Sequence, residues 1–147
     1  MMVITNYMRK EHRACDEIFA DAEKSVIDGD FEKAEEEFLL FANETLKHFK
    51  KEDDELFPLF ESITGNTEGP TRVMRFEHEQ VRGVIGKMAK SLEDKDKDAY
   101  LSLAESLMIL LQQHNMKEEQ MLYAMCDRVI PQDKKDEILK VMDKIEL

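Results

Sequence analysis

The sequence predicts an all-α protein: an up-down-up-down four-helix bundle with a short fifth helix at the C-terminus. Four long stretches repeat apolar residues every three or four positions, and short connectors separate them. Turn-forming residues are scarce, with 5 Gly and 3 Pro among 147 residues, which disfavours many-stranded sandwiches and barrels. Because 42% of the residues are hydrophobic, the chain is too apolar for disorder, and its length suits a single domain over residues 1–147.

The first two stretches predict a helical hairpin over residues 1–62. Steps of four and three connect one apolar stripe, which consists of Met8, His12, Cys15, Phe19, Ala22 and Val26. Gly29 provides a C-terminal stop, and Asp28 or Asp30 can cap the next helix. The stripe of that helix consists of Phe31, Ala34, Phe38, Phe41, Thr45, His48, Glu52, Leu56 and Leu59. Pro58 lies late in it and is expected to kink or end it.

The next two stretches predict a second hairpin over residues 70–128, after a loop rich in Gly and Thr. Its first stripe consists of Met74, His78, Val81, Ile85, Met88 and Leu92. A charged connector, residues 93–98, precedes the other stripe, which consists of Tyr100, Ala104, Leu107, Leu111, His114, Glu118, Leu122 and Met125. Pro131 then opens the short C-terminal helix, predicted over residues 131–146.

The two predicted hairpins repeat one another at an offset of 66 residues. The segment Met-Arg-Lys-Glu-His that ends at His12 recurs as Met-Arg-Phe-Glu-His, ending at His78. His48 with Glu52 likewise recurs as His114 with Glu118. Leu56-Phe57 corresponds to Leu122-Tyr123 at the same offset. Every histidine of the chain therefore belongs to an equivalent pair, one histidine for each predicted helix.

Six side chains of this repeat are predicted to converge in the bundle interior and to hold two metal ions. Each histidine that precedes a glutamate by four residues shares a helix face with it. Two facing buried carboxylates would repel one another unless cations lay between them. Each metal would take two imidazoles, from His12 and His48 or from His78 and His114, and both carboxylates would bridge. The predicted ligands are His12, His48, Glu52, His78, His114 and Glu118.

Other carboxylates near these positions leave alternatives open. Glu119 competes with Glu118; it points about 140° away on an ideal helix, but a π-bulge would bring it in. Glu11 and Glu77 lie about 100° off the stripe, so that surface salt bridges are expected for them, although one could border the cavity. Glu44, one turn before His48, is a candidate carboxylate at the cavity edge or outside the ligands.

Imidazole together with carboxylate suits Fe, Zn, Mn or Co. The predicted donors leave each six-coordinate ion short of ligands, so that water, an oxo or hydroxo bridge or a diatomic molecule could complete the set. Two iron ions make such open positions useful, and Zn or Mn are candidate substitutes. The Glu-x-x-His motif of ferritin-like centres is absent. A histidine-rich site favours reversible ligand binding over strong oxidation.

These residues resemble the hemerythrin-like, or HHE cation-binding, family over essentially the whole chain. The resemblance rests on Glu11-His12, His48-x-x-x-Glu52 with Glu55-Leu56-Phe57-Pro58, Glu77-His78, and His114-x-x-x-Glu118. It implies a four-helix bundle that holds a non-haem di-iron centre, with O₂ bound at one iron in the oxygen-carrier members.

The sequence differs from the oxygen carriers at two positions. Their third helix supplies two histidines four residues apart, whereas Met74 and Arg82 flank His78 here. Their last helix places the carboxylate five residues after its histidine, and Glu118 is four after. The set of four His and two Glu is instead similar to the branch that repairs iron–sulfur centres after nitrosative or oxidative stress. In that branch, acidic residues that match Glu44 and Glu77 border the cavity.

The expected function is binding of a small diatomic ligand, O₂ or NO, for sensing or stress response. Two alternatives stay open: iron donation to damaged iron–sulfur centres or peroxide consumption, and a metal-free structural or interaction bundle. A net charge of −12 disfavours nucleic acid and anionic membranes as partners. A cytoplasmic location is expected, because the 2 Cys form no disulfide framework and no apolar run resembles a signal peptide or a membrane span.

Overall fold

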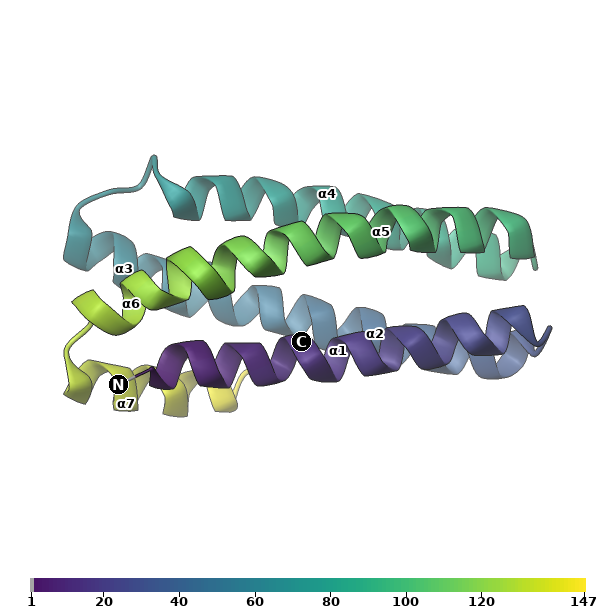
Figure 1. The fold of residues 1–147 in the computed structure, drawn as a ribbon. Helices are drawn as coiled ribbons and strands as arrows, with labels where there is room; N and C mark the ends of the chain where they lie inside the picture. The colour runs from purple at the N-terminus through teal and green to yellow at the C-terminus, as the bar shows by residue number, and fades with distance from the viewer. Residues whose placement is uncertain (1) are drawn as a thin grey trace.

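The computed structural model describes residues 2–147, which fold into an antiparallel bundle of long helices (Figure 1). The helices are α1 (Val3–Ile27), α2 (Phe31–Lys51), α3 (Phe57–Thr64), α4 (Pro70–Glu93), α5 (Lys97–Lys117), α6 (Tyr123–Val129) and α7 (Gln132–Asp143). Two π-helical turns, η1 (Glu52–Leu56) and η2 (Glu118–Leu122), continue α2 into α3 and α5 into α6. The predicted all-α bundle with a short C-terminal helix is therefore confirmed. None of the helices in residues 2–147 has the length and apolarity needed to cross a membrane.

Each π-turn begins at a glutamate that the sequence predicts as a ligand, Glu52 or Glu118. A π-turn holds more residues than an α-turn, so it changes which side chains of the following helix face inward. Pro58 does not end the helix, as the sequence had suggested it could, because α3 continues to Thr64. It lies within the first turn of α3, where a missing N–H is tolerated. The equivalent residue after η2 is Ala124, so the π-turn does not require a proline.

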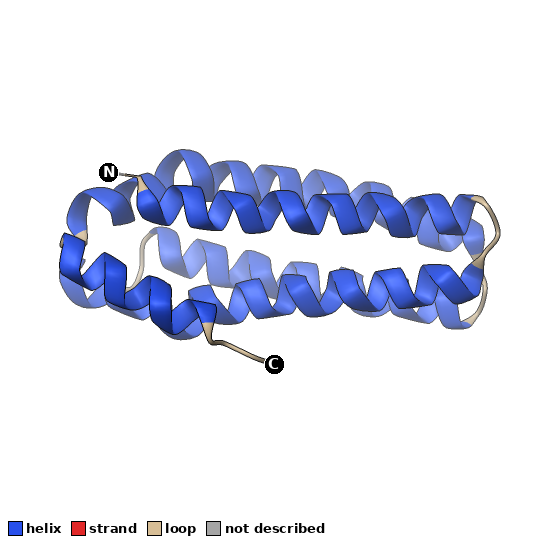
Figure 2. Cartoon of the chain, turned by 90° about the horizontal axis from the view of Figure 1, so that it is seen from below, coloured by secondary structure: helices blue, strands red, loops and turns tan. Residues whose placement is uncertain are grey.

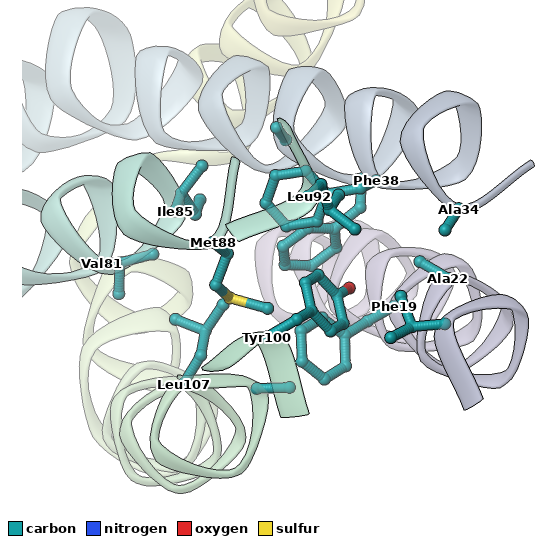
Figure 3. Close-up of a cluster of buried hydrophobic side chains, with 14 of the residues drawn as sticks. Phe19, Ala22, Ala34, Phe38, Val81, Ile85, Met88, Leu92, Tyr100 and Leu107 are labelled. Atoms are coloured by element: carbon teal, nitrogen blue, oxygen red, sulfur yellow. The ribbon is translucent and has the colours of Figure 1, made fainter. Parts of the chain in front are cut away.

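The apolar stripes form two buried clusters, one on each side of the predicted ligand positions along α1. The larger cluster joins α1, α2, α4 and α5 and contains several aromatic rings, including Phe19, Phe38 and Tyr100 (Figure 3). The other cluster joins the beginning of α1 to η1, α3, α6 and α7, with Met8 in it. Each large apolar side chain buried in this way contributes roughly 1.5–3 kcal/mol to stability. His12 lies between Met8 and Phe19 on α1, so the two clusters hold a polar layer between them.

The beginning of α1 is capped by a side chain from the far end of the chain. Met2, at the N-cap position, makes no side-chain cap. The carboxylate of Asp127 in α6 instead accepts hydrogen bonds from the backbone N–H groups of Ile4, at 2.9 Å, and Thr5, at 3.0 Å. The Thr5 hydroxyl donates to the same carboxylate at 2.6 Å, and the Lys135 ammonium of α7 lies 3.8 Å from it. Asp127 of α6 therefore contacts both α1 and α7. The bundle is seen from below in Figure 2.

Gly29 ends the first hairpin helix in a conformation that L side chains rarely adopt, with φ at +79°. Gly29→Ala is expected to lower the free energy of unfolding by about 1 kcal/mol, because a Cβ strains this left-handed backbone although no atom lies within 4 Å of it. Gly83→Ala in the interior of α4 is the matched control, since the new Cβ again meets nothing within 4 Å. It should raise the free energy by about 1 kcal/mol through helix propensity. Changes of the same sign in the free energy of unfolding of the two variants, measured by urea denaturation, would contradict this prediction.

Candidate metal centre

The six predicted ligands lie together in the polar layer between the two apolar clusters. His78, His114, Glu52 and Glu118 are fully buried, and His12 is 5% exposed. They come from all four long helices of the bundle: α1, α2 with its continuation η1, α4, and α5 with its continuation η2. The helical stripes placed the histidines inward, and the π-turns start at the two glutamates, so that their carboxylates face each other between the imidazoles.

One group of donors consists of His12, His48 and the carboxylates next to them. The Nε2 atoms of His12 and His48 are 3.0 Å apart. Glu118 Oε1 lies 3.2 Å from His12 Nε2, and Glu52 Oε1 lies 3.4 Å from His48 Nε2. Donor atoms of His12, His48 and Glu118 all lie within 4.8 Å of one another, which is close enough for a single metal ion.

The other group consists of His78, His114, Glu52 and Glu118, whose donor atoms also lie within 4.8 Å of one another. His78 Nε2 is 3.2 Å from Glu52 Oε1, and His114 Nε2 is 3.1 Å from Glu118 Oε1. Each glutamate therefore contacts one histidine of each pair. The structure brings together all six residues in the arrangement that two metals with bridging carboxylates would need, and their role as ligands stays a prediction.

Several donor atoms of this layer have no hydrogen-bond partner within residues 2–147. They are Glu52 Oε1, His78 Nε2, His114 Nε2 and Glu118 Oε2, all completely buried. Buried polar atoms in native proteins are almost always satisfied, because an unpaired one costs roughly 1–3 kcal/mol. Imidazole nitrogen and carboxylate oxygen are typical ligands of divalent metals. A bound cation would satisfy all four atoms, so these residues fit a metal.

The outer nitrogens of His48 and His114 donate to equivalent glutamates of the repeat. His48 Nδ1 lies 2.8 Å from Glu11, and His114 Nδ1 lies 2.8 Å from Glu77. A lysine three positions after each of these histidines completes each set, since Lys51 pairs with Glu11 and Lys117 pairs with Glu77. The salt bridges expected for Glu11 and Glu77 are present, and each carboxylate also contacts an imidazole that is predicted to bind metal. Such contacts fix the ring so that Nε2 points inward.

The outer nitrogens of His12 and His78 donate to the residues that follow the two buried glutamates. His12 Nδ1 lies 2.8 Å from Glu119, and His78 Nδ1 lies 2.9 Å from Asp53. Glu119 also accepts from Arg9 at 2.8 Å. Glu119, the alternative to Glu118, therefore lies on the outer side of His12, whereas Glu118 lies beside the inner nitrogens. Asp53 and Glu119 occupy equivalent positions of the sequence repeat, and this equivalence could have predicted that both contact a histidine.

Glu44 lies at the edge of an open cavity of about 400 Å³ that reaches His48. Its carboxylate is 39% exposed and lies 3.3 Å from the Lys47 ammonium. Cys15 and Tyr7 line the same cavity. Glu44 thus lines the cavity through which His48 is reached from the surface.

Tyr123 is a residue of the centre that the sequence reasoning missed. Its hydroxyl lies 2.7 Å from Glu52 Oε2 and 3.0 Å from Glu118 Oε1. The same oxygen is 3.2 Å from His12 Nε2 and 3.3 Å from His48 Nε2. The repeat contained the signal, because the residue equivalent to Tyr123 is Phe57 and the two differ by one hydroxyl group.

The two buried glutamates have opposite pKa shifts in the metal-free protein. Burial raises the pKa of Glu52, and the negative charge of Glu118 raises it further. Burial also opposes ionisation of Glu118, but the charge of His114 and hydrogen bonds from its neighbours outweigh this and hold its pKa well below the ordinary value. In the metal-free protein, a proton is therefore held more tightly by Glu52 than by Glu118.

The stability of the metal-free protein is expected to fall as the pH rises above neutrality. Burial opposes the positive charge of His12 and His78, but their carboxylate partners outweigh it and raise the pKa to about 9 and about 11, respectively. A raised pKa in the folded state stabilises below the unfolded value of 6.5, and this contribution is lost as the pH rises through the folded value. Urea denaturation of metal-free protein between about pH 6 and pH 10 checks this. A free energy of unfolding that rises over this range would contradict it.

A family model described as the hemerythrin HHE cation binding domain matches residues 3–126, a range that contains all six predicted ligands and Tyr123. No curated protein and no solved structure matches the chain.

Proposed function

We propose, from the premise that this chain belongs to the hemerythrin HHE cation-binding family, that it holds two iron ions and binds a small diatomic ligand, O₂ or NO. The family and the buried His/Glu groups support metal binding. The observation that carries the proposal is the set of completely buried donor atoms without hydrogen-bond partners in this layer. His12 with His48, and His78 with His114, would each hold one iron, and Glu52 with Glu118 would contact both.

When bound, the iron pair supplies an open coordination position for the diatomic molecule. The chain's own residues hold the imidazoles in place, because each ring donates its Nδ1–H to a carboxylate and turns Nε2 toward the metal position. In the metal-free protein, the raised pKa values of His12 and His78 mean that metal must displace protons from both rings.

Aromatic rings exclude water from the His78 side of the centre. The Phe49 ring is stacked on the His78 imidazole, with ring centroids 3.9 Å apart, and the Phe57 ring lies at 5.9 Å. Both phenylalanines are at most 2% exposed. A site so closely packed suits a ligand of two atoms rather than an extended substrate.

Metal analysis combined with optical spectroscopy tests this proposal. Protein loaded anaerobically with Fe²⁺ should retain about two iron ions per chain after desalting. Its absorption spectrum should change on exposure to O₂ or NO and return when the gas is removed. His114→Gln should lower the iron content, whereas Glu44→Gln, at the cavity edge, should leave it unchanged.

Three other results would point to the alternatives. Absence of bound metal in the wild-type protein would leave a structural or interaction bundle. Irreversible loss of iron in air, with transfer of the iron to an iron-depleted iron–sulfur protein, would identify a repair function. Turnover of added hydrogen peroxide would identify peroxide consumption.

A further inference from the structure

The hydroxyl group of Tyr123 breaks the two-fold symmetry of the centre. We propose, building on the iron centre of the proposed function, that Tyr123 is a metal ligand on the His12/His48 side. The iron there would have a phenolate oxygen that the other iron lacks, so the external diatomic ligand would bind at the His78/His114 side.

The spacing of the donor atoms carries this inference. Neighbouring ligands on an octahedral ion with bonds of about 2.1 Å lie about 3.0 Å apart. Tyr123 Oη lies between 2.7 and 3.3 Å from one atom each of Glu52, Glu118, His12 and His48. The two imidazole Nε2 atoms are 3.0 Å apart. The phenol oxygen therefore lies at the distances of neighbouring ligands from four donor atoms, among them those of His12, His48 and Glu118, which also lie close enough together for one metal ion.

The hydroxyl group also has four polar neighbours, whereas its one O–H and two lone pairs can pair with at most three of them. Tyr123 is completely buried, and its single O–H faces two carboxylate oxygens and two imidazole nitrogens. A cation in the middle of this group would satisfy all of these atoms at once. Coordination replaces the phenolic proton, which passes to solvent, and no electron is transferred.

The equivalent position on the other side offers no such donor. Phe57 takes the place of Tyr123 in the repeat, and its ring lies nearly parallel to that of His78, at an angle of 12°. The second metal would therefore have two imidazoles and two shared carboxylates as protein ligands. It would keep more open positions than the first metal, which is why the external ligand is assigned to it.

Resonance Raman and visible spectroscopy of the ferric protein test the assignment. The iron-loaded, oxidised wild-type protein should show a phenolate-to-iron charge-transfer band, and excitation in that band should enhance tyrosine ring vibrations. The chain has 3 Tyr, so Tyr7→Phe and Tyr100→Phe are the matched controls and should keep the band. Tyr123→Phe should lose it. The double variant Tyr123→Phe/Phe57→Tyr should regain it, because the phenol then lies beside the other pair of histidines.

The outcomes separate this inference from the proposed function. Wild-type protein that retains two irons but shows no phenolate band would overturn the inference and leave the iron centre intact. Wild-type protein without iron would overturn both. If Tyr123→Phe fails to hold iron, the wild-type protein and the two control variants still test the assignment. A band that persists in both Tyr7→Phe and Tyr100→Phe must come from Tyr123, because the chain has 3 Tyr.

Discussion

Glu52→Gln is expected to abolish tight metal binding while leaving the metal-free protein folded. Glu52 contacts one histidine of each pair, so the loss of its charge weakens both metal positions at once. We expect the metal affinity to fall by roughly 100-fold or more, since even substitutions outside the ligands cost 10–100-fold. Burial and the charge of Glu118 raise the pKa of Glu52 and so disfavour its ionised form in the metal-free protein, and glutamine has nearly the same shape as the carboxylic acid. The free energy of unfolding without metal should therefore change by less than about 1 kcal/mol.

Titration with Zn²⁺ and with Fe²⁺, alongside urea denaturation of the metal-free protein, measures both effects. Asp54→Asn is the matched control, because Asp54 lies on the same π-turn but is exposed. It should change neither the affinity nor the stability. Full retention of two tightly bound metals by Glu52→Gln would contradict the ligand assignment, and unfolding of that variant without metal would show a structural role instead.

Asp127→Ala is expected to lower the free energy of unfolding by about 3 kcal/mol. It removes the acceptor of two backbone N–H groups and of the Thr5 hydroxyl, and both Ile4 and Thr5 are completely buried. Loss of an N-terminal cap costs about 1 kcal/mol, and each buried donor left without a partner adds a penalty of roughly 1–3 kcal/mol that local relaxation reduces. Asp127→Asn should have an intermediate effect, because its amide keeps one acceptor oxygen.

Urea denaturation of the metal-free variants measures this loss of stability. Asp133→Ala, an exposed residue in the first turn of α7, is the control and should shift the free energy by less than about 0.5 kcal/mol. A loss below 1 kcal/mol for Asp127→Ala would show that other groups replace the cap.

The helices could be predicted because their apolar stripes are long and regular, and because residues such as Asp30 carry local capping signals. Asp30 does cap α2, accepting from Lys33 N at 3.2 Å. The π-turns could not be predicted, since the residues of η1 and η2 fit an α-helix equally well and only packing between helices selects the wider turn. The cap from Asp127 joins residues more than 120 positions apart and leaves no local pattern.

The inner donors of the candidate site could be predicted because repetition doubled a weak signal. One His-x-x-x-Glu motif is common on helix surfaces, but two copies at one offset, with His12 and His78 at equivalent places, are not. The outer carboxylates were harder to predict. The angle between Glu11 and the apolar stripe of α1 does not indicate which residue of the neighbouring helix its carboxylate contacts. Glu11 in fact contacts His48 of α2 rather than a group on its own helix. For Tyr123, the missing information was the wider turn that brings its hydroxyl into the layer.

The short connection between the two hairpins, residues 65–69, determines how metal binding depends on protein concentration. Each hairpin carries two of the histidines and one of the two buried glutamates, so neither holds the full set of predicted donors alone. Because the connection is covalent, each half meets the other at an effective concentration of about millimolar or higher. Assembly of the centre is thus unimolecular, and it should not weaken on dilution. Two separate hairpins with the same side chains would have to meet by diffusion before they could share a metal.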